Sequence, residues 1–173
     1  MFEMPRLETS TEPRPHAYDP DRQPEYFDGV LARRIVAFLI DAVIVIGPIL
    51  ALAFFIFVFG LVTFGLGWLL FWLLSPIFVL WALTYTGITL GAPESATLGM
   101  RMVDLEMRTW YGGRMYFLLG AVHAIFFWVL TTTLTPLVLV VALLNGRRRL
   151  LHDFLTGTIV VNNEARAARL RRK

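Results

Sequence analysis

Two long stretches without a charged side chain constrain this chain most. Neither Asp, Glu, Lys nor Arg occurs between Asp41 and Glu94, or between Arg114 and Arg147. A helix that crosses a bilayer needs about 20 mostly apolar residues, so the first stretch holds two spans and the second holds one long span or two short ones. Charged residues make up 17% of the chain, against about 25% in an average soluble domain. The chain is therefore predicted to be an integral membrane protein.

The polar and apolar segments divide the chain into three parts. Residues 1–28 are acidic and rich in proline, which predicts a disordered tail. Residues 29–162 are predicted to form the membrane domain, and residues 163–173 a basic tail. Apolar runs predict helices at about residues 30–59, 68–90, 115–131 and 134–146. The expected fold class is an all-α membrane protein, a helical bundle of three to four transmembrane segments.

Two short segments have the pattern of β-strands. Residues 100–107 partly alternate apolar and polar side chains, and residues 157–161 form a second strand candidate that ends at two asparagines. A two-stranded ribbon between these segments would satisfy the backbone hydrogen bonds of both. Such a ribbon requires both segments to lie on the same side of the membrane.

The basic residues predict the orientation in the membrane. Arg33 and Arg34 place the N-terminus in the cytoplasm by the positive-inside rule. If residues 115–146 crossed once, eight basic residues from Arg147 onward would lie outside, whereas a hairpin within the membrane keeps every basic cluster inside. We therefore favour a hairpin that breaks at residues 131–136, with both termini cytoplasmic. The basic C-terminal residues are expected to contact anionic lipid, and no aromatic interleaving supports nucleic-acid binding.

Asp41 is the most informative single residue, because a carboxylate at mid-bilayer costs at least about 2.5–3.5 kcal/mol. It follows Arg34 by two helical turns, which places both on one face, about 10.5 Å apart along the axis and too far for a direct ion pair. Asp41 is therefore either a functional carboxylate or a hydrogen-bonded tie between helices. At the membrane boundary, Arg34 and Asp153 are expected to form a charge cluster with one of the arginines at 147–149, of which Arg149 is a candidate.

Two histidines are secondary candidates. His123 is the one residue of the third apolar run whose side chain ordinarily titrates near neutral pH. It could relay protons, although a hydrogen bond between helices is the commoner role. His152 precedes Asp153, but adjacent side chains do not face one another in a helix, so no dyad is expected. The chain has no cysteine and no phosphate-binding loop, zinc-protease motif or recognisable nucleophile. The sequence therefore predicts no enzyme, no cofactor and no metal site.

Three motifs in order resemble the RDD family, which is named for one arginine and two aspartates. Arg34 and Asp41 within residues 31–41 match the opening motif, and Asp153 within residues 151–161 matches the closing one. Residues 96–104 resemble the middle motif, although the family often has lysine where this chain has Met100. The resemblance covers about residues 26–162. It implies a multi-pass protein of the bacterial inner membrane, in a family suggested to act in transport.

Two functions remain open at this point. In the first, the chain moves ions or small solutes, with Asp41 as a protonatable site and with Arg34 and Asp153 setting its electric field or forming a gate. Because three or four helices are few for a self-contained pore, this function would require a homo-oligomer. In the second, the chain is a non-catalytic scaffold or accessory subunit in which the same residues are structural ties. A lipid-modifying enzyme is the weakest interpretation, because no catalytic constellation is visible.

Overall fold

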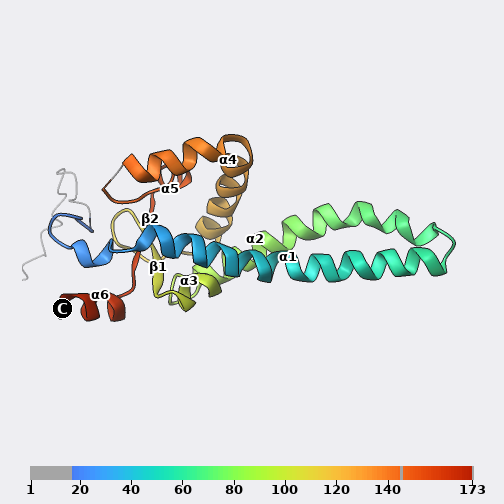
Figure 1. Ribbon diagram of the computed structural model, residues 1–173, viewed down its shortest axis with the longest axis horizontal. Helices are drawn as coiled ribbons and strands as arrows, with labels where there is room; N and C mark the ends of the chain where they lie inside the picture. The colour runs from blue at the N-terminus through green and yellow to red at the C-terminus, as the bar shows by residue number, and fades with distance from the viewer. Residues whose placement is uncertain (1–16, 145, 173) are drawn as a thin grey trace, which may run out of the picture.

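A long antiparallel helical hairpin dominates the structure (Figure 1). The computed structural model describes residues 17–144 and 146–172, with the backbone alone for residues 135–139. The hairpin consists of α1 (Val30–Val62), the 3-10 helix η2 (Leu66–Leu73) and α2 (Leu74–Gly91). At about 1.5 Å per residue, the 33 residues of α1 extend about 50 Å, which exceeds the ~30 Å hydrocarbon core of a bilayer.

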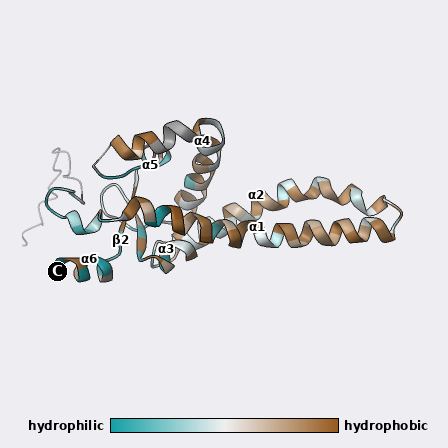
Figure 2. Ribbon diagram, viewed as in Figure 1, coloured by the Kyte–Doolittle hydropathy of each residue, from teal (hydrophilic) through white to brown (hydrophobic). Residues whose placement is uncertain are grey.

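The residues of this hairpin are mostly hydrophobic (Figure 2). Large side chains are exposed along it, including Phe54 at 70% and Trp72 at 71%. In the described residues, three helical segments are long and apolar enough to cross a membrane: Pro24–Val62, Leu66–Gly91 and Phe117–Leu134. Because exposed apolar side chains are favourable in lipid and unfavourable in water, the helical membrane protein expected from the sequence is what the structure shows.

The helix α4 (Phe117–Leu144) turns sharply part-way along its length (Figure 1). Its first half packs antiparallel to α2, where Phe117 lies against the small residues Gly87 and Gly91. Leu134 has non-helical angles, φ −130° and ψ 31°, and marks the bend. Beyond it, Ala142 is fully buried and packs in one cluster with Leu130 of the first half, with Leu31 of α1, and with the two leucines at residues 150–151. The chain therefore returns to the end of the bundle at which α4 began.

A two-stranded antiparallel sheet closes that end. Strand β1 (Leu105–Thr109) pairs with β2 (Thr158–Asn162), with Leu105 opposite Asn162. The predicted ribbon is thus confirmed, but its first strand starts later than residue 100, because residues 98–102 form the short helix α3 (Leu98–Met102) instead. Its N-cap is Thr97, whose side chain accepts a hydrogen bond from Met100 N. Residues of both strands pack in one apolar core with the start of α1 and the end of α2.

The two segments predicted as tails are partly folded. The 3-10 helix η1 (Pro24–Tyr26) packs against α6 (Glu164–Arg171), and both Tyr26 and Phe27 are buried in a cluster with Ala167. Tyr26 donates a hydrogen bond to Glu164, and Arg171 forms an ion pair with Glu25 at 2.6 Å. The apolar contacts of these aromatic side chains offset the conformational entropy that the two segments lose on becoming ordered. Their polar residues alone would not offset that loss. The prediction of disorder for residues 1–16 lies outside the described residues.

Candidate functional site

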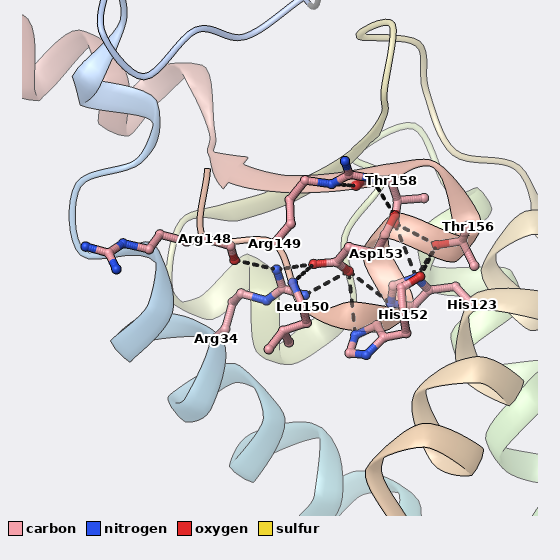
Figure 3. A network of polar contacts seen from close by, with 9 residues as sticks. All are labelled: Arg34, His123, Arg148, Arg149, Leu150, His152, Asp153, Thr156 and Thr158. Carbon is pink, nitrogen blue, oxygen red and sulfur yellow. Dashed lines mark hydrogen bonds and ion pairs between the residues drawn. The ribbon is translucent and has the colours of Figure 1, made fainter. Parts of the chain in front are cut away.

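Arg34 and Asp153 form a buried, bidentate ion pair between α1 and α5 (Leu151–Thr156) (Figure 3). Arg34 Nη1 donates to Asp153 Oδ2 at 2.6 Å, and Nη2 donates to Oδ1 at 3.0 Å. The Asp153 side chain is 0% exposed and that of Arg34 is 11% exposed. Two parallel N–H···O bonds between a guanidinium and a carboxylate are among the strongest side-chain interactions. This pair therefore fixes α5 against the start of α1.

The Asp153 carboxylate also caps its own helix. Leu150 N donates to Asp153 Oδ2 at 2.9 Å, which satisfies a backbone N–H that the first turn of α5 would leave unpaired. Burial alone raises the pKa of Asp153, but the charge and hydrogen bonds of Arg34 outweigh it and hold the pKa well below its usual range. The carboxylate is therefore ionised at neutral pH.

Arg149 is held beside this pair by stacking and by backbone carbonyls. Its guanidinium lies 4.1 Å from the ring centres of both Trp110 and Phe154. Nε donates to the carbonyl of Thr158 at 2.9 Å, and Nη2 donates to the carbonyl of Asp153 at 2.7 Å. Burial lowers the pKa of Arg149, although an arginine stays charged at any physiological pH. Arg149 thus joins the charge cluster through the backbone carbonyl of Asp153.

Both histidines face the same carboxylate oxygen. Nε2 of His152 lies 3.5 Å from Asp153 Oδ1, and Nε2 of His123 lies 3.9 Å from it. The expectation that His152 and Asp153 would not meet fails because Asp153 turns back to cap α5 and brings Oδ1 toward the preceding residue. Burial lowers the pKa of His152 to about 4, so its imidazole is neutral at neutral pH.

Asp41 lies in α1, away from this cluster, and binds the segment that begins α3. Oδ1 accepts hydrogen bonds from the Tyr85 hydroxyl at 2.6 Å and from Gly99 N at 2.8 Å, while Oδ2 accepts one from the Thr97 hydroxyl at 2.6 Å. The Tyr85 oxygen in turn accepts from Leu98 N at 3.2 Å. The carboxylate thus satisfies, directly and through Tyr85, N–H groups that the start of a helix leaves unpaired.

A cavity of about 340 Å³ connects the two charged regions. It lies among α1, α2 and α4, and most of its wall is apolar, with Phe38, Phe127 and Trp128 among the aromatic members. Its polar wall includes six side chains from both regions: Arg34, Asp41, Tyr85, Thr97, His123 and His152. A volume of this order lies at the lower end of the range for small-ligand pockets.

The structure brings together most of the residues singled out in the sequence. Arg34, Asp153, Arg149, His123 and His152 meet in one network (Figure 3). Asp41 stands apart from that network but shares the cavity with it.

Sequence reasoning missed the partners of Asp41, which are Tyr85, Thr97 and Gly99. One signal was present, because Thr97 has the character of an N-cap residue before a short helix. Gly99 had no such signal. Its role follows from close approach: a Cβ there would lie 2.2 Å from the carbonyl oxygen of Ala37.

Comparison with known proteins identifies the family. The model of the RDD family matches residues 29–157, which include Arg34, Asp41 and Asp153. No curated protein and no solved structure matches the chain. Because the match covers most of the chain and includes both partners of the buried ion pair, the chain belongs to the RDD family of membrane proteins.

Proposed function

We propose that this protein moves small cations across the bacterial inner membrane in exchange for protons, with Asp41 as the carboxylate that binds them. The observation that supports this proposal is the cavity among the apolar helices, whose wall includes Asp41. Arg34 and Asp153 neutralise each other in their ion pair. Asp41 has no cationic partner of its own among the described residues and therefore makes the cavity negative, which favours a cation over an anion.

Hard cations such as Na⁺ are bound in proteins by carboxylate, hydroxyl and carbonyl oxygens. Asp41 is surrounded by such oxygens, since the hydroxyls of Tyr85 and Thr97 each lie 2.6 Å from it. A hydroxyl can turn from donor to acceptor, so the same three side chains would hold a proton or a cation on Asp41 in turn. We propose this exchange as the coupling step.

A scaffold or accessory subunit is the second candidate, and a specific observation favours it. Both oxygens of Asp41 and both oxygens of Asp153 accept hydrogen bonds that link separate segments of the chain. Ties of this kind need no transport function to explain them. Neither candidate includes an enzymatic step, because the sequence shows no nucleophile in a recognisable setting.

We also propose an orientation and partners. The basic residues around α6 and the loop before α5 would lie on the cytoplasmic side, where anionic lipid attracts them at about 1 kcal/mol each. Both termini would then be cytoplasmic. A homo-oligomer would supply the further helices that a complete pathway needs.

The test is transport by the purified full chain in liposomes. A pH gradient is imposed, Na⁺, K⁺ or Li⁺ is added outside, and a pH-sensitive dye reports the gradient. Asn fits at Asp41, because its oxygen can still accept from Gly99 N while its NH₂ donates to the Thr97 hydroxyl. Asp41→Asn should therefore fold and elute normally on size exclusion, yet it should abolish collapse of the gradient by the cations.

Asp104→Asn is the matched control, because Asp104 is a carboxylate outside the cavity that pairs with Arg169 at the surface. This variant should transport as the native chain does. Collapse that survives Asp41→Asn would refute Asp41 as the coupling carboxylate. A well-folded native chain that collapses no gradient with any of the three cations would refute the transport proposal and favour the scaffold.

A further inference from the structure

Three ligand atoms of the kind that bind transition metals converge beside the cavity. His123 on α4 and His152 and Asp153 on α5 each offer one such atom, and the three atoms lie within 4.8 Å of one another. With bonds of about 2.1 Å, the ligand atoms of a tetrahedral zinc ion stand roughly 3.4 Å apart. The distances of 3.9 Å and 3.5 Å from the two Nε2 atoms to Asp153 Oδ1 are close to that spacing.

The hydrogen bonds around His123 leave the lone pair of its Nε2 facing Asp153 Oδ1. The Thr156 hydroxyl donates its single hydrogen to the His152 carbonyl at 2.8 Å. The Thr158 hydroxyl lies nearer to Thr156 Oγ1, at 2.9 Å, than to His123 Nδ1, at 3.4 Å, and we assign its hydrogen to the Thr156 oxygen. The Thr156 oxygen, 3.2 Å from His123 Nδ1, then also accepts the Nδ1 hydrogen. This assignment leaves Nε2 of the neutral ring as an acceptor that faces a carboxylate oxygen with no hydrogen between them. Metal-binding histidines are characteristically oriented by such a second hydrogen bond.

His152 is buried without the hydrogen bonds that a structural histidine would make. Within the described residues, its Nδ1 has no partner, although the residue is only 1% exposed. Its Nε2 contact with Asp153, at 3.5 Å, is longer than a normal hydrogen bond. Nε2 is therefore a buried ring nitrogen with no hydrogen bond of normal length. An ion bound at Nε2 would give that atom a partner, while Nδ1 would carry the ring hydrogen.

The charges around the site select the class of ion. Arg34 donates to both oxygens of Asp153, so a cation that depends on carboxylate charge, such as Mg²⁺ or Ca²⁺, gains little there. The two imidazoles must supply most of the affinity, and imidazole suits zinc and its neighbours in the first transition row. Both histidines line the cavity, so a fourth coordination position faces it.

We propose that His123, His152 and Asp153 form a binding site for a divalent transition-metal ion of the zinc type, with its fourth position open to the cavity. No motif in the sequence indicated this site, because the two histidines lie on different helices that only the bend in α4 and the return to α5 bring together. The proposal depends neither on Asp41 nor on transport.

The test measures zinc bound to the purified full chain, prepared without a polyhistidine tag. Competition with a fluorescent chelator gives the affinity, and elemental analysis after dialysis gives the stoichiometry, expected to be one per chain and unaffected by excess Mg²⁺. His123→Gln and His152→Gln should each weaken binding by at least roughly tenfold, since losing even an outer-shell partner costs about 10–100-fold. His16→Gln, which removes the one other histidine, is the matched control and should bind as the native chain does.

Failure of the native chain to bind zinc, or equal binding by the His123 and His152 variants, would overturn the proposal. If those variants do not fold, as judged by size exclusion, X-ray absorption of zinc bound to the native chain decides instead. Coordination by two imidazoles would support the site, and coordination by oxygen alone would overturn it. Zinc binding that persists in Asp41→Asn would show that the metal site does not require Asp41. Loss of zinc binding in Asp41→Asn would contradict the proposal that the metal site is independent of Asp41.

Discussion

Among the residues that the structure describes, two arginine–aspartate pairs have the same shortest distance and very different burial. Arg34 and Asp153 are 2.6 Å apart with side chains 11% and 0% exposed. Arg169 and Asp104 are also 2.6 Å apart, but their side chains are 62% and 36% exposed. Because the bond lengths match, replacing each arginine by methionine compares a buried pair with a surface pair inside one protein.

Arg34→Met leaves the Asp153 carboxylate buried and without its cation. Removing one partner of a buried pair costs about 3–5 kcal/mol, because the remaining charge stays desolvated. Arg169→Met leaves Asp104 in contact with solvent, where such pairs contribute about 0–1 kcal/mol. We therefore expect the free energy of unfolding to fall several times further for Arg34→Met than for Arg169→Met.

The assay is unfolding in mixed micelles by increasing amounts of SDS, followed by helical circular dichroism. The double variant Arg34→Met with Asp153→Asn should be more stable than Arg34→Met alone, because the uncompensated charge is then gone while the introduced amide oxygen can still accept from Leu150 N. If Arg34→Met and Arg169→Met differ by less than about 1 kcal/mol, burial does not set the strength of this pair and the reasoning is refuted.

Two further predictions concern packing and topology. Gly99→Ala should lower the free energy of unfolding by about 1–3 kcal/mol, because its Cβ would lie 2.2 Å from the carbonyl oxygen of Ala37. Gly47→Ala is the control: a Cβ there would have nothing within 4 Å, so the free energy of unfolding should stay unchanged or rise by up to about 1 kcal/mol. Equal effects of the two substitutions in SDS unfolding would contradict the packing argument. The topology can be tested with single cysteines, because the native chain has none. A cysteine replacing Phe64 at the tip of the hairpin should react with an impermeant thiol reagent added to intact cells, whereas one replacing Asn163 should react only after permeabilisation. Labelling of both cysteines from the same side would refute the proposed topology.

The ribbon and the bend in α4 show why much of the architecture could be predicted. Lipid offers no hydrogen bonds to the backbone, so long uncharged segments must become helices. The excess of basic residues beyond Arg147 then favours a return within the membrane. The structure has its bend at Leu134, inside the predicted break, and it pairs Leu105–Thr109 with Thr158–Asn162.

The folding of the two tails could not be predicted from the sequence. Tyr26 and Phe27 are two aromatic residues in a polar, proline-rich segment, and composition alone favours disorder there. They are buried because β2 and α6 provide an apolar surface, which includes Ile159 and Ala167. No local pattern encodes that surface, since its parts come from opposite ends of the chain.

For the charged residues too, one part of their role could be predicted from the sequence and another part could not. The sequence by itself determined that Arg34, Asp41 and Asp153 need partners, because the cost of placing a charge in an apolar medium is a local property. Only the tertiary structure decided which partners they have. Asp153 binds Arg34, whereas Asp41 binds Tyr85, Thr97 and Gly99. The choice depends on where the chain returns after α2 and α4, and those returns are set by packing among distant segments rather than by any neighbouring residue.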